Sequence, residues 1–239
     1  EERALAAANV YEVTRAEIEA HGWNSLAEIL ANVPGLYVID DLVDPSVGVR
    51  GVTGGVAAGT RIVKVMIDGI AVAFRPNLHA SVGPEFIPIA AIERVEIAKG
   101  PLSALYGANA FLATVNVITR EPGSRLGAEL SARGTFVQNF GSGGSGLLSY
   151  GSTHWDVLAA FSTETIDRSG LRIQQTFADQ SFPTYAPFFA DSSHNDLASP
   201  MSGFLHVRGR FDRIGNFTLR GGVQRLDSMG EFQLNSALT

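Results

Sequence analysis

The chain changes character at Glu121-Pro122-Gly123. Before this point, strand-like runs at residues 92–98 and 113–120 flank a Lys-Gly-Pro turn at 99–101 and a small-residue segment at 102–110. After it, apolar residues begin to alternate with polar ones, which is the period of a strand with two unlike faces. The sequence therefore predicts a compact domain over residues 1–122, followed by a large β structure over residues 123–239.

Composition restricts the classes of protein that remain. Hydrophobic residues make up 45% of the 239 residues, which is enough for a folded core. The formal net charge is −6, which argues against nucleic acid as a partner. Cysteine is absent, so disulfides and thiolate metal sites are excluded. No apolar run reaches the roughly 18 residues of a transmembrane helix, so a membrane role would have to be played by strands.

The first half predicts a small mixed sheet with short helices. Thr14 is expected to cap a helix at 15–21, because Glu17 stands in capping-box position. Ser25 is expected to open a second helix, with Glu28 three residues on. Asp68-Gly69 between two apolar runs predicts a hairpin turn. The second helix should bury an apolar stripe: Leu26, Ile29, Leu30 and Val33.

Four runs in the second half alternate strictly: residues 126–133, 155–162, 205–211 and 217–224. Tight turns are expected at 152–154 and 212–215, and a long loop at 168–199. Short turns on one side and long loops on the other are typical of an outer-membrane barrel, although the strands of a soluble β-sandwich also alternate. The glycine-rich segment 141–146 is expected to be a flexible hairpin tip, because neither a Lys-Ser/Thr pair nor a helix pattern follows it.

In their order and spacing, several pieces of residues 9–121 resemble the plug domain of TonB-dependent outer-membrane receptors. The pieces are VYEVTRAEIE, SLAEILANVPGLYV, VGVRGV, VKVMIDGIAV, IPIAAIERVEIAKGPLSALYGANA and VNVITR. The resemblance implies an α+β plug domain followed by the N-terminal antiparallel strands of a transmembrane β-barrel. A plugged barrel needs about 22 strands, whereas this chain supplies about five or six. We therefore expect it to be a fragment of a longer receptor.

The resemblance also implies a function. Such receptors lie in the outer membrane, bind a scarce solute and import it to the periplasm with energy passed on by TonB and its inner-membrane complex. The solutes include ferric siderophores, haem, cobalamin and similar chelates, and outer-membrane lipid surrounds the barrel. No cofactor and no enzymatic activity are implied. TonB usually contacts a short extended segment before the plug, and no convincing segment of this kind is visible, so we expect it to have been removed. The alternative is a non-transporting envelope protein that retains the plug as a binding or signalling module.

The family places three plug loops beneath the ligand, and by position they contain the candidate substrate-binding residues. Phenylalanine, arginine, asparagine and histidine in the third loop could hold an anionic or chelated ligand, or could be ordinary solvated loop residues. The aspartates of the first loop could hold Ca²⁺, although their spacing fits no EF-hand. The candidates are Asp40, Asp41, Asp44, Phe74, Arg75, Asn77 and His79.

Four charged residues stand beside apolar strands: Arg50, Glu93, Arg94 and Lys99. The resemblance implies that matching positions pair with carboxylates of the barrel wall and hold the plug in place. Plain surface solvation is the alternative for each of them. Where the family usually has arginine this chain has Lys99, which keeps the charge but loses the bidentate fork.

Overall fold

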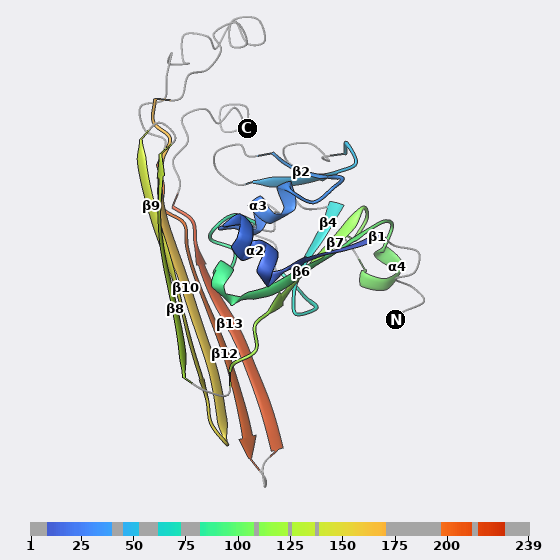
Figure 1. The fold of residues 1–239 in the computed structure, drawn as a ribbon. Coiled ribbons are helices and arrows are strands. Elements are labelled where there is room, and N and C mark those ends of the chain that lie inside the picture. Colours follow the sequence, from blue (N-terminus) through green and yellow to red (C-terminus); the bar gives the residue numbers. More distant parts are fainter. Residues whose placement is uncertain are drawn as a thin grey trace, which may run out of the picture.

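The computed structural model describes residues 9–39, 45–52, 62–72, 82–107, 110–123, 126–136, 139–170, 197–211 and 215–227. These residues form two parts (Figure 1). The described residues from 9 to 123 form an α+β unit, called here the N-terminal unit. The strands that follow form an antiparallel sheet, called here the long sheet. The last strand of the N-terminal unit ends at Thr119 and the first strand of the long sheet begins at Gly127.

The N-terminal unit is built on a five-stranded mixed sheet with the order β1-β6-β7-β4-β5. Strands β4 and β7 run parallel, and the other neighbours are antiparallel. A separate two-stranded sheet pairs β2 with β3. The strand bounds are β1 Asn9–Thr14, β2 Leu36–Ile39, β3 Ser46–Val49, β4 Val63–Ile67, β5 Ile70–Ala71, β6 Ile92–Lys99 and β7 Ala113–Thr119.

Short helices complete the N-terminal unit. They are α2 (Arg15–His21), α3 (Leu26–Ala31), the 3-10 helix η2 (Ile89–Ala91) and α4 (Ser103–Tyr106). Helix α3 begins at the predicted Ser25 cap, whose hydroxyl accepts a hydrogen bond from the backbone of Glu28. The predicted stripe is buried, and Ile29 and Leu30 are fully inaccessible to solvent. Helix η2 contacts strands of the long sheet, so one hydrophobic core continues across both parts.

The predicted capping box of α2 is present. The Thr14 hydroxyl accepts a hydrogen bond from the backbone of Glu17, and the Thr14 backbone N–H donates to the Glu17 carboxylate at 2.8 Å. The Thr14 backbone and then its hydroxyl lower the pKa of Glu17 by donating to the charged carboxylate. A lowered folded pKa stabilises the fold above the unfolded pKa of about 4.3, and this contribution is lost as the pH falls through the folded pKa.

Thr14→Ala is therefore expected to lower the free energy of unfolding of the N-terminal unit by about 1 kcal/mol at neutral pH. The variant should also lose less stability than the parent on acidification. Without the Thr14 hydroxyl, the folded state stabilises the charged Glu17 carboxylate less, so less stability is lost when that carboxylate is protonated. Denaturant titration of the protein at neutral and acid pH measures both effects. Thr218→Ala, at an exposed threonine of β13, is the matched control. An equal loss in both variants would contradict the capping role.

The long sheet has the strand order β13-β12-β10-β9-β8, and short β11 pairs with the C-terminal end of β10. The N-terminal unit packs against one face of this sheet (Figure 1). Among the described residues no helix is long and apolar enough to cross a membrane. The strand bounds are β8 Gly127–Phe136, β9 Phe140–Gly151, β10 Trp155–Asp167, β11 Leu197–Ala198, β12 Met201–Phe211 and β13 Gly215–Arg225.

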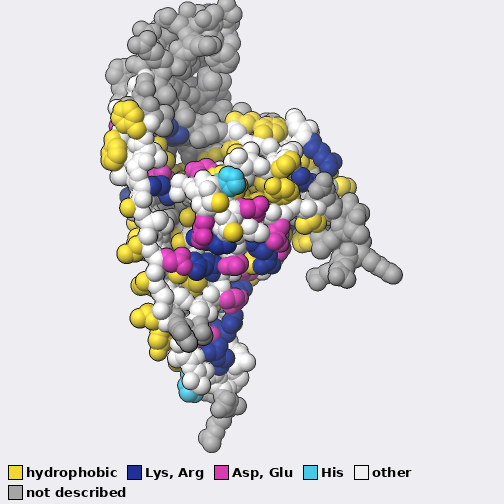
Figure 2. Space-filling model, in the orientation of Figure 1, with side chains coloured by type: hydrophobic (Ala, Val, Ile, Leu, Met, Phe, Trp, Pro, Cys, Tyr) yellow, Lys and Arg dark blue, Asp and Glu magenta, His cyan; other side chains and the backbone are white. Residues whose placement is uncertain are grey.

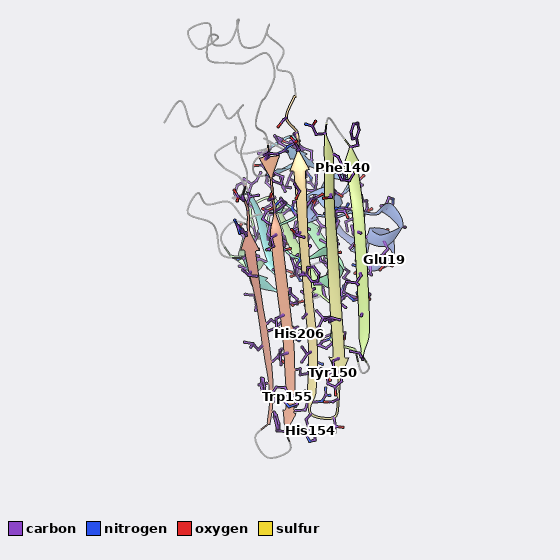
Figure 3. All side chains as sticks on the ribbon, turned by 90° about the vertical axis from the view of Figure 1, so that its left-hand side faces the viewer. Glu19, Phe140, Tyr150, His154, Trp155 and His206 are labelled. Atoms are coloured by element: carbon purple, nitrogen blue, oxygen red, sulfur yellow. The ribbon has the colours of Figure 1, made fainter. Side chains whose placement is uncertain are left out.

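The two faces of the long sheet differ as the alternation predicts. On the inner face, Leu147 and Leu158 are buried against the N-terminal unit. The outer face exposes large apolar side chains, which line the margin of the molecule turned away from the N-terminal unit (Figure 2). Aromatic side chains mark both ends of this face, with Phe140 at one end and Trp155 at the other (Figure 3). At the Trp155 end, Phe217 lies edge-on to the indole, with ring centroids 5.5 Å apart.

The glycine-rich segment 141–146 was predicted wrongly as a hairpin tip. It lies inside β9 and pairs with β8 on one side and β10 on the other. Its glycines make room for neighbouring side chains: a Cβ on Gly146 would lie 2.4 Å from the Phe161 ring, and one on Gly141 would lie 2.6 Å from the Thr135 hydroxyl. The low strand propensity of glycine misleads here, because the space above these residues is filled from adjacent strands.

Candidate functional site

The candidate substrate-binding residues lie outside the described residues, in the segments 40–44 and 73–81. This applies to Asp40, Asp41, Asp44, Phe74, Arg75, Asn77 and His79. Their role therefore stays a prediction. The described residues contain no group of three or more His, Cys, Asp or Glu side chains placed to hold a metal ion.

The four charged residues expected to pair with the barrel are all described. Arg50 and Glu93 are exposed, and Arg50 has a left-handed backbone with φ of 50°. Arg94 pairs with Glu96 at 2.7 Å, within the N-terminal unit. Lys99 is buried, and its ammonium donates to the carbonyl of Pro34 at 2.7 Å. In the described ranges no ion pair joins any of the four to the long sheet, and their pairing with barrel carboxylates stays a prediction.

A different set of polar residues joins the N-terminal unit to the inner face of the long sheet. We call these contacts the seam. Arg120, just after β7, makes a bidentate ion pair with Glu129 of β8, with both N–O distances 2.7 Å. The Glu129 hydrogen bonds raise the pKa of Arg120 further above its already high value. Bidentate guanidinium–carboxylate pairs fix orientation as well as distance, so this pair sets how the chain enters the long sheet.

The β4–β5 turn supplies a second anchor of the seam. Asp68 and Gly69 both have positive φ, as the predicted Asp-Gly hairpin turn requires. The Asp68 carboxylate accepts hydrogen bonds from the backbone N–H of Thr119 at 2.9 Å and from its hydroxyl at 2.7 Å. The same carboxylate lies 3.4 Å from the guanidinium of Arg220 on β13. The turn is therefore tied both to the end of β7 and to the long sheet.

Glu121 extends this cluster along the inner face. It lies 3.3 Å from Arg220 and also pairs with Arg208 of β12. His206, which faces Arg220 in the strand register, is fully buried in β12. Two arginines of the sheet thus meet two carboxylates of the N-terminal unit, and these opposite charges would have to separate if the parts moved apart.

Uncharged hydrogen bonds also belong to the seam. The Ser202 hydroxyl donates to the carbonyl of Pro84 at 3.2 Å, and the Gln224 amide donates to the carbonyl of Phe86 at 2.6 Å. Gly123 donates its backbone N–H to the Ser149 hydroxyl at 2.7 Å. Such neutral hydrogen bonds contribute about 1 kcal/mol each and are readily exchanged for water. These contacts therefore hold the two parts together less firmly than the charged anchors.

Arg133 of β8 makes a third charged contact near the Phe140 end of the sheet. Its guanidinium pairs with Glu164 of β10 at 2.8 Å and donates to the Asn24 side chain at 2.7 Å. Both charged side chains are largely buried, with 16% and 10% exposure. Asn24 comes directly before Ser25, the N-cap of α3, so this arginine reaches the start of a core helix.

Two cavities lie along the seam. One, of about 260 Å³, lies between the β4–β5 turn and strands β12 and β13, and Asp68, Arg220 and Gln224 are its polar lining. The other, of about 360 Å³, is lined by Glu28, Glu85 and Glu164. Burial raises the pKa of Glu28, and repulsion from Glu164 adds to this effect. Unfilled space therefore lies beside the polar contacts of the seam.

The long sheet has an apolar outer face, and its inner face buries both apolar and polar side chains against a docked α+β unit. These features are those of a plugged outer-membrane receptor. Residues 3–114 match the family model described as TonB-dependent Receptor Plug Domain. This match and the relatives below support a TonB-dependent receptor. The predicted fold class is confirmed, since the strands after the plug match the barrels of such receptors. The predicted location in the outer membrane is confirmed as well.

Curated relatives agree with this family. The chain is 33% identical over 150 residues to the vitamin B12 transporter BtuB of Photobacterium profundum, covering 62% of this chain and 23% of that protein. It is 27% identical over 143 residues to an iron-regulated outer membrane virulence protein of Vibrio cholerae, covering 58% and 21%. The chain thus spans less than a quarter of the length of these relatives.

A solved structure shows the same fold. A mutant of the ferric enterobactin receptor PfeA from Pseudomonas aeruginosa superposes with a TM-score of 0.70 at 17% identity, covering 95% of this chain and 35% of that one. Sequence reasoning missed the residues of the seam: Asn24, Asp68, Arg120, Glu121, Arg133, Arg208 and Arg220. A signal was available for three of them, because Arg133, Arg208 and Arg220 occupy inward positions of alternating strands.

Proposed function

We propose that the protein containing this chain is an active transport receptor of the outer membrane. It binds a scarce metal chelate, such as a ferric siderophore, haem or cobalamin, and imports it to the periplasm with energy transmitted by TonB. The observation that carries the proposal is the docking of a plug on the inner face of a sheet whose outer face suits lipid. The plug is held there by buried apolar side chains and by the polar contacts of the seam. Relatives named as a vitamin B12 transporter and as a ferric enterobactin receptor support the solute class.

Polar docking suits a part that has to move. The interface between the plug and the long sheet contains an apolar part, which gains free energy from excluding water. It also contains hydrogen bonds and ion pairs, which can be exchanged for water at a smaller net cost. The cavities of about 260 and 360 Å³ beside these contacts leave room for the exchange. The loops that contain Asp40, Asp41, Asp44, Phe74, Arg75, Asn77 and His79 are proposed to lie under the ligand.

Uptake by cells tests the proposal. The full-length receptor is expressed in a bacterium without its own chelate receptors, with and without TonB, and supplied with radiolabelled cyanocobalamin, haem or ferric enterobactin. We expect saturable accumulation of one of these chelates that requires TonB. Binding without accumulation in cells that have TonB would support the alternative, a non-transporting envelope module that retains the plug. Absence of both binding and accumulation for every chelate would contradict the proposed solute class.

A further inference from the structure

Three residues form a row across the inner face of the long sheet. Arg133 of β8 stands opposite Gly143 of β9, and Gly143 stands opposite Glu164 of β10. The arginine therefore reaches the glutamate by lying across the middle strand. A Cβ on Gly143 would lie 3.0 Å from Nε of Arg133 and 3.2 Å from the carbonyl oxygen of Thr163. Glycine at this position keeps the path of the arginine open.

The Arg133 guanidinium uses its donors in two directions. Nε and Nη2 contact the two carboxylate oxygens of Glu164 at 3.2 and 2.8 Å, and Nη1 donates to Oδ1 of Asn24 at 2.7 Å. The carboxylate of Glu164 holds the planar guanidinium in place through Nε and Nη2. Nη1 is therefore already directed at the N-terminal unit. Arg133 is part of the long sheet, and its side chain needs no rearrangement to form a hydrogen bond with Asn24.

The acceptor is fixed as well. The Asn24 backbone N–H donates to Glu28 Oε2 at 2.8 Å, and the next residue, Ser25, caps α3. Asn24 is therefore attached to the first turn of a helix whose apolar stripe lies in the core. A hydrogen bond from Arg133 to this side chain positions α3 relative to the long sheet.

We propose that Arg133, with Gly143 beneath it, is a reversible latch of the plug at the Phe140 end of the wall. The reason is an asymmetry in what separation leaves behind. When Asn24 leaves, Arg133 keeps its pair with Glu164, and only one guanidinium N–H and the neutral Asn24 acceptor have to be rehydrated. When Asp68 and Glu121 leave Arg220, opposite charges are separated. The Arg133 contact therefore opens before the Asp68 anchor.

This inference rests on the proposed function only in assigning the opening to transport. It is tested by thiol labelling, since the chain contains no cysteine. Cysteine is placed at Ala27, which is 9% exposed next to the latch, in the full-length receptor in outer membranes. The rate of maleimide labelling reports opening. Asn24→Ala and Gly143→Val should each raise this rate about tenfold, the effect of losing one charge-assisted hydrogen bond.

A second set of variants separates the latch from general destabilisation. Gly127→Val is the matched control, because a Cβ at Gly127 meets no atom within 4 Å, and its labelling rate should stay at the parent value. The double variant of Asn24→Ala and Gly143→Val should label no faster than either single variant, since both remove one contact. Parent-like rates in both single variants, or additive rates in the double variant, would overturn the latch.

Asn24→Ala keeps the test informative if Gly143→Val fails to fold, because it leaves the wall unchanged. Chelate uptake by the same cells is measured separately. Faster labelling in cells that take up no chelate would support the latch and count against the proposed function. Labelling of the variants at the parent rate, in cells with normal uptake, would contradict the latch and support the proposed function.

Discussion

Ile29→Ala is expected to lower the free energy of unfolding of the N-terminal unit by about 3 kcal/mol, within the usual range for removing a buried isoleucine side chain. Ile29 is completely inaccessible to solvent on α3 and belongs to the core that also contains Leu147 and Leu158 of the long sheet. The substitution removes three carbons, and the surrounding strands cannot collapse fully into the space. Denaturant titration of the full-length receptor, followed by a probe in the N-terminal unit, measures the loss.

The matched control makes the same chemical change on the surface. Ile70 of β5 is 70% exposed, so Ile70→Ala should change the free energy of unfolding by less than about 0.5 kcal/mol. Equal losses for both variants would mean that α3 is not packed as described. A probe on the long sheet should respond less to Ile29→Ala than the probe in the N-terminal unit, because the long sheet has its own ladder of backbone hydrogen bonds.

Local signals in the sequence predicted most of the N-terminal unit. The Thr14 and Ser25 caps, the stripe around Ile29 and the Asp68-Gly69 turn each depend on residues a few positions apart, and all four are present. The alternating runs likewise predicted which face of the long sheet is apolar. In these cases the residues that determine the structure are neighbours in the chain, so a pattern in the sequence is sufficient.

The seam could not be predicted in this way. The partner of Asp68 is Arg220, and the partner of Asn24 is Arg133; these pairs meet only because the N-terminal unit docks on the sheet. The prediction for the segment 141–146 failed for the same reason. The side chains that fill the space above its glycines belong to other strands. In an alternating strand, charged residues at the positions between the apolar ones point inward. Such residues, for example Arg133 and Arg208, are the one local sign of a docking surface that the sequence offers.

Asp68→Ala is expected to weaken attachment of the N-terminal unit by about 3 kcal/mol. The substitution leaves the Thr119 backbone N–H and hydroxyl without their acceptor, and it removes a carboxylate from Arg220. It also places alanine at a φ of 49°, which aspartate and asparagine tolerate better. Thermal unfolding of the purified full-length receptor, monitored separately in the N-terminal unit and the long sheet, measures the effect.

Two further variants divide this effect into its parts. Asp68→Asn keeps an acceptor for Thr119 and tolerates the left-handed backbone, so the loss it retains reports the ion pair with Arg220. Asp227→Ala is the surface control, because its pair with Arg225 is mostly exposed and should contribute little. If Asp68→Asn costs as much as Asp68→Ala, charge rather than turn geometry anchors the plug here. If neither variant differs from the parent, Asp68 is not an anchor, and Arg120 with Glu129 remains as the principal charged attachment.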